Sequence, residues 1–119
     1  MSPARYMREK ARELPVGDCF VAPSDWQESG LATVIVTRRR PDGNLAAGLF
    51  EVDTFCLGVI DATYFASMTD EKLEKILGKR GFEKISYEEA HNIIYGAIAF
   101  AEEGGIKPCK DFMPAGYIL

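Results

Sequence analysis

The sequence has no long hydrophobic run, no close pair of cysteines and only one histidine. Its longest nearly apolar stretch, Ile93 to Ala101, is far shorter than the roughly 18 residues that a membrane-spanning helix needs. The first ten residues lack the apolar core of a secretory signal. Cys19, Cys56 and Cys109 are an odd number and widely separated, which suits a reducing compartment better than a disulfide framework. These absences predict a soluble cytoplasmic protein and give no reason to expect a membrane partner.

The composition is that of an ordinary globular chain. Of its 119 residues, 47% are hydrophobic, so the chain is long and apolar enough to bury a core without disulfides or metals. The formal net charge of −4 is too small for a disordered chain, and its sign argues against a protein that coats DNA. Because no repeat, linker or low-complexity stretch interrupts the sequence, we expect a single α+β domain over residues 1–119.

Three stretches predict helices. The first begins at the N-cap Ser2 and the second at the N-cap Thr69. The third, over residues 87–103, opens with the capping box Ser86-Tyr-Glu-Glu89. Its apolar residues form a broad arc, which predicts a central helix packed across one face of a sheet.

The sheet is predicted around one hairpin. The turn Arg40-Pro41-Asp42-Gly43 joins a β-branched strand to a returning one, and a further turn or bulge is expected at Asp53-Thr54 because one strand from 44 to 61 would be unusually long. We therefore expect an antiparallel sheet of about four strands. The four predicted strands are Gly17–Ala22, Leu31–Arg38, Leu45–Asp53 and Phe55–Ile60.

Several segments, taken together, resemble an uncharacterised family of small bacterial proteins over roughly Leu14 to Leu119. The most specific is the Val-Asp…Cys-Leu-Gly-Val…Asp block within Gly48–Ala62; the others are Gly30–Arg39, Pro41–Asn44, Tyr95–Ile98 and Gly105–Phe112. The family has no assigned activity, so the resemblance implies no cofactor and no catalytic residue. Its pattern has His where this chain has Cys109, which weakens any metal site there, and its members continue beyond the Tyr-Ile-Leu at 117–119.

Four polar residues could form a rim at one edge of the sheet: Asp53, Asp61, His91 and Asp111. Carboxylates and an imidazole that converge could bind a divalent metal or share acid–base work. However, an Asp at a strand end usually caps a turn, and no HxH, HExxH or DxD spacing is present. We therefore keep a metal-assisted enzyme as the alternative function, and assign no metal or other cofactor.

Arg38, Arg39 and Arg40 form a basic run at the predicted hairpin tip. Beside aromatic residues, such a run could bind single-stranded nucleic acid, with the guanidinium groups on phosphates and the rings on bases. Arginines at a hairpin tip also serve as ordinary solvated residues that discourage edge-to-edge association of sheets. Nucleic acid is therefore a weakly supported partner.

The chain ends in apolar residues, which chain termini usually lack unless they are docked. Phe112, Tyr117, Ile118 and Leu119 should therefore pack on the domain itself or on a protein partner such as a second copy. With no glycine-rich phosphate loop in the sequence, nucleotide hydrolysis is not expected. The sequence thus favours a small non-enzymatic binding or accessory module of unknown partner, in one version contacting nucleic acid through Arg38 to Arg40.

Overall fold

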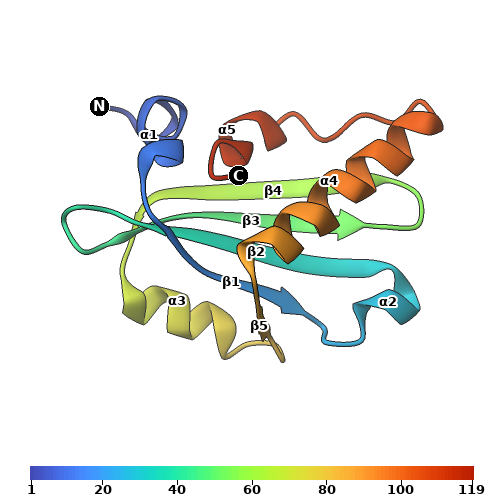
Figure 1. Cartoon of the computed structure of the whole chain (residues 1–119), viewed down its shortest axis with the longest axis horizontal. Coiled ribbons are helices and arrows are strands. Elements are labelled where there is room, and N and C mark those ends of the chain that lie inside the picture. The colour runs from blue at the N-terminus through green and yellow to red at the C-terminus, as the bar shows by residue number, and fades with distance from the viewer.

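The structure, a computed structural model, describes all of residues 1–119 and has a five-stranded antiparallel sheet with helices on both faces (Figure 1). The expected α+β class is confirmed, but the sheet has five strands rather than four. None of the protein's helices combines the length and the apolar character that a membrane span requires. In chain order the elements are α1 (Pro3–Lys10), a 3-10 turn η1 (Ala11–Glu13), β1 (Val16–Ala22), α2 (Trp26–Ser29), β2 (Leu31–Arg39), β3 (Leu45–Asp53), β4 (Gly58–Met68), α3 (Asp70–Leu77), β5 (Glu83–Ile85), α4 (Tyr87–Glu103) and α5 (Phe112–Gly116).

The sheet has the strand order β4-β3-β2-β1-β5, so β2 and its hairpin partner β3 lie in the interior. These two strands pair without interruption from Leu31 opposite Asp53 to Arg39 opposite Leu45. Their turn carries Gly43 at a φ of 90°, a left-handed conformation that glycine adopts without strain. Helices cover both faces of the sheet at β2, whose residues are buried from Ala32 to Arg38, which explains why neither side of this strand is strongly polar.

The strand expected at Phe55–Ile60 begins three residues later than predicted, at Gly58, and the turn expected at Asp53-Thr54 is present over residues 54–57. The chain turns there, because the Asp53 carboxylate accepts hydrogen bonds from the backbone N–H groups of Phe55 (3.0 Å) and Cys56 (3.1 Å). The returning strand β4 begins only at Gly58 and then runs for 11 residues to Met68. Two bulges in β4 accommodate this length, because the pairing with β3 shifts register between Leu45 and Ala47 and again between Glu51 and Val52.

One face of the sheet packs against α4, α1 and α5. The expected contact between the central helix and the sheet is confirmed, since Ile94 and Ile98 of α4 share one buried cluster with Val34 and Phe50. The opposite face packs against α3, where Leu73 joins a smaller buried cluster. The other buried members of that cluster are Ile35, Leu45, Ala47 and Met68.

The C-terminal residues dock on the chain's own core. Ile118 is fully buried and Leu119 is 7% exposed. The Tyr87 hydroxyl of α4 donates a hydrogen bond to the carbonyl oxygen of Leu119 (2.8 Å), and Arg38 Nε donates one to that of Ile118 (2.7 Å). The sequence left open whether these residues pack on the domain or on a partner; here they belong to the domain.

Candidate functional site

The structure does not bring the polar rim Asp53, Asp61, His91 and Asp111 into one site. Asp53 caps the turn after β3, and Asp61 is an exposed residue of β4. His91 lies on α4 between two tyrosines, and Asp111 precedes α5 without capping it. No group of three or more His, Cys, Asp or Glu side chains lies where it could hold a metal ion.

The basic run at the hairpin is also not a free cationic surface. Arg38 is only 6% exposed, because it lies on the face of β2 that bears Val34 and Val36 and is covered by the C-terminal segment. Its guanidinium donates to the carbonyl oxygens of Ile118 (2.7 Å) and Leu14 (2.8 Å). The sequence treated this residue as part of a solvated tip, and that part of the nucleic-acid hypothesis is wrong.

The two neighbouring arginines bond within the domain as well. Arg39 donates to the carbonyl oxygen of Gly43 (2.8 Å) and pairs with Asp70 (3.2 Å). Arg40 pairs with Asp42 (3.2 Å), donates to a carbonyl oxygen of β4 and lies 4.1 Å above a tyrosine ring of α1. Arg40 thus bonds within the protein through Nε and both Nη atoms, whereas Arg39 bonds through Nη1 alone and its side chain is 48% exposed.

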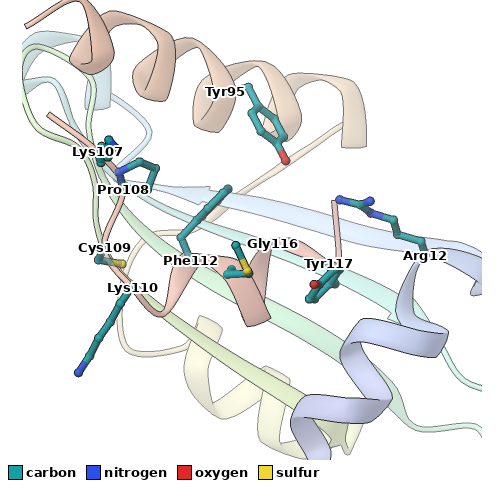
Figure 2. A pocket seen from close by; sticks show the side chains of 10 residues that line it. Arg12, Tyr95, Lys107, Pro108, Cys109, Lys110, Phe112, Gly116 and Tyr117 are labelled. Atoms are coloured by element: carbon teal, nitrogen blue, oxygen red, sulfur yellow. The ribbon is translucent and has the colours of Figure 1, made fainter. Parts of the chain in front are cut away.

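A different place in the fold offers a cleft, with a volume of about 460 Å³ (Figure 2). It lies between α4, α5, the segment that joins them and the turn η1. This size lies within the range of small-molecule sites, which is roughly 300–1,000 Å³. The lining residues are Arg12, Tyr95, Lys107, Pro108, Cys109, Lys110, Phe112, Met113, Gly116 and Tyr117.

Phe112 is the fixed aromatic surface of this cleft. Its ring lies 5.9 Å from that of the buried Phe50 and 6.1 Å, edge to face, from that of Tyr95. A Cβ atom on Gly116 would lie 3.3 Å from the Phe112 ring, so the absence of a side chain at this position makes room for the ring. Anchored in this way, the ring presents a rigid apolar surface to the cleft.

The cleft has cations on its lining and no acidic residue. Arg12, Lys107 and Lys110 all line it, and none of them forms an ion pair within the protein. The Arg12 guanidinium lies 5.7 Å from the ring centre of Tyr117 and donates no hydrogen bond to the protein. In Figure 2 the side chain of Lys110 extends away from the other lining residues, so we take Arg12 and Lys107 as the two cations that face the cleft.

His91 stands behind the cleft rather than in it. Its ring lies 4.5 Å from that of Tyr95 and 5.8 Å from that of Tyr87, one helical turn on either side. The imidazole therefore braces Tyr95, whose hydroxyl points toward the space between α4 and Arg12 (Figure 2). Of the four rim candidates, His91 contacts the lining residue Tyr95, and Asp111 lies between the lining residues Lys110 and Phe112, but neither lines the cleft itself.

No protein-family model matches the chain, and no curated protein or solved structure is significantly similar to it. The resemblance to a small bacterial family therefore stays a prediction from the sequence.

The cleft itself carries no local motif, because Arg12, Tyr95 and Phe112 come from three distant segments. Only the expectation that Phe112 and Tyr117 pack on the domain or on a partner pointed toward this place.

Proposed function

We propose that the protein is a binding module for a small organic anion with a flat apolar part, and that the cleft around Phe112 is its site. One observation carries the proposal. Arg12 and Lys107, which have no ion-pair partner, line the same cleft as the anchored ring of Phe112. Most sites for small molecules combine such an apolar surface with a few polar groups that fix orientation.

The cationic groups favour an anion for a physical reason. Arg12 and Lys107 have no carboxylate partner in the protein, so a bound anion would add an ion pair without breaking one. Arg12 offers a planar fork of donors that suits a carboxylate or a phosphate. Because both residues are exposed, each pair contributes modestly, and apolar contact with Phe112 must supply the rest of the affinity.

The nucleic-acid version of the binding-module hypothesis receives less support. It depended on Arg38 to Arg40, of which Arg38 is buried and Arg40 is bonded to the protein, so that only Arg39 keeps unbonded donors. The single nucleotide adenosine monophosphate is still a member of the proposed ligand class, because it joins a flat base to a phosphate. A metal-assisted reaction is not proposed, since the residues that it required are dispersed over the fold.

The experiment is calorimetric titration of the protein with 2-naphthoate, beside the uncharged 2-naphthamide and adenosine monophosphate. We expect 2-naphthoate to bind and the amide to bind at least several-fold more weakly, because only the carboxylate reaches the cations. Equal binding of the acid and the amide, or no binding of either anion, would contradict the proposal.

A matched pair of variants locates the binding. Met113→Glu places a negative charge on the cleft at a residue that is 70% exposed, and we expect it to abolish binding of 2-naphthoate. Phe100→Glu makes the same change of charge at an exposed apolar residue of α4 that does not line the cleft. If both variants lose binding equally, the anion binds through overall charge and not in the cleft.

A further inference from the structure

The two cations of the cleft are anchored at opposite ends of the sheet. Near Lys107, the backbone N–H of Cys109 donates to the carbonyl oxygen of Val59 (3.1 Å), at the start of β4. Arg12 instead belongs to η1, whose end is held by the hydrogen bond from Arg38 to Leu14 (2.8 Å), at the far end of β2.

The strand register gives the distance between these two anchors along the sheet. Val59 pairs with Val52, and Val52 pairs with Ala32, so the first anchor lies level with Ala32 of β2. The second lies level with Arg38, six residues further along the strand. At about 3.3 Å per residue, the two anchors are roughly 20 Å apart along the strand direction.

The aromatic surface lies between the two cations. In Figure 2, Lys107 and Cys109 stand at one side of the cleft and Arg12 at the other, with Phe112 and Gly116 between them. Lys107 and Arg12 have long side chains that can reach inward from their anchors. The cleft is therefore a trough with an apolar floor and one cation at each end.

We infer that the ligand of this trough is an elongated dianion, with an acidic group at each end and a flat apolar middle, such as an aromatic dicarboxylate. This inference rests on the proposed function and specifies its ligand class. A ligand with both charges at one end would leave either Arg12 or Lys107 without a partner. A ligand with its charges at opposite ends can form an ion pair with each of the two cations while its apolar middle covers Phe112.

The test compares two isomers that differ only in where the charges lie. Naphthalene-2,6-dicarboxylate carries its carboxylates at opposite ends, and naphthalene-2,3-dicarboxylate carries them side by side. We expect the 2,6 isomer to bind about tenfold more tightly than the 2,3 isomer and than 2-naphthoate. Equal or tighter binding of the 2,3 isomer would overturn the inference and leave the proposed function standing. If none of the three binds, both fail.

Variants assign the two charges to the two ends. Arg12→Gln and Lys107→Gln each remove one cation at an exposed position, so both should fold like the wild type. Each should lower the affinity for the 2,6 isomer about tenfold, to the level of 2-naphthoate. The controls Arg8→Gln and Lys79→Gln change exposed cations that do not line the trough and should leave this affinity unchanged. An effect of only one of the two cleft variants would overturn the two-ended arrangement.

Discussion

Glu51 of β3 and Asp61 of β4 stand directly opposite each other in the sheet. Glu51 has partners, since it accepts a hydrogen bond from the Thr33 hydroxyl (2.9 Å) and lies 3.9 Å from the Arg80 guanidinium, which also donates to Thr33. Asp61 has no hydrogen bond or ion pair through its side chain. Two carboxylates at directly opposed positions repel each other, so Asp61 weakens the sheet that carries it.

Replacing Asp61 with Asn should therefore stabilise the protein, by roughly 0.2–1 kcal/mol. The amide keeps the shape of the side chain and removes the repulsion with Glu51. Urea unfolding at low ionic strength measures the difference, which should shrink in high salt because salt screens exposed charges. A clear loss of stability in Asp61→Asn would instead reveal a structural role that needs the charge.

Local sequence signals were sufficient to predict the helices and strands whose ends are determined by residues next to those ends. The strand at Leu45–Asp53 has the predicted bounds, because the turn before it is encoded by Pro41, Asp42 and Gly43. The N-caps Ser2, Thr69 and Ser86 were also predicted, and each side chain accepts a backbone hydrogen bond of the first turn.

Features that depend on packing between distant segments could not be predicted. The strand β5 has three residues and exists because it pairs with β1. The burial of Arg38 depends on the docking of Ile118, which lies 80 residues further along the chain. The cleft escaped prediction for the same reason, since its cations and its rings meet only after α5 has packed.

Arg38 should contribute to stability and not to ligand binding. Arg38→Met removes the guanidinium that bonds to the carbonyl oxygens of Ile118 and Leu14, and leaves both buried acceptors without that donor. We expect a loss of roughly 2–4 kcal/mol in the free energy of unfolding, measured by urea denaturation.

Arg39→Met is the matched control for this variant. Arg39 is the next residue on β2, its side chain is 48% exposed and its ion pair is with a surface carboxylate. Its replacement should change stability by no more than about 0.5 kcal/mol. Equal effects of the two variants would refute the structural role of Arg38.

The contact between α4 and the sheet can be tested at Ile98. Ile98 is 7% exposed and shares the main core cluster with Phe50, so Ile98→Ala should leave a cavity and lower the free energy of unfolding by roughly 2–5 kcal/mol. Phe100→Ala, on the same helix but 54% exposed, should cost much less. An unchanged unfolding midpoint for Ile98→Ala would contradict the packing of α4.

Cys19 should make the protein less stable at alkaline pH. Burial raises the pKa of the Cys19 thiol above its ordinary value of 9.0, and the neighbouring Asp18 carboxylate raises it further, against the lowering effects of the Thr37 backbone and of Arg38. Well below pH 9 the thiol is protonated in the folded and the unfolded chain alike. Above that value the unfolded chain loses this proton first, so ionisation favours unfolding until the pH exceeds the folded pKa.

The variant Cys19→Ala isolates this effect, because it removes one titrating thiol and keeps Cys56 and Cys109. The stability advantage of the wild type over the variant should be constant from pH 7 to about 8.5 and should then fall, by up to about 1.4 kcal/mol per pH unit. Urea unfolding under a reducing agent at a series of pH values measures the difference. A difference that stays constant through pH 10 would mean that solvent reaches the Cys19 thiolate in the folded protein.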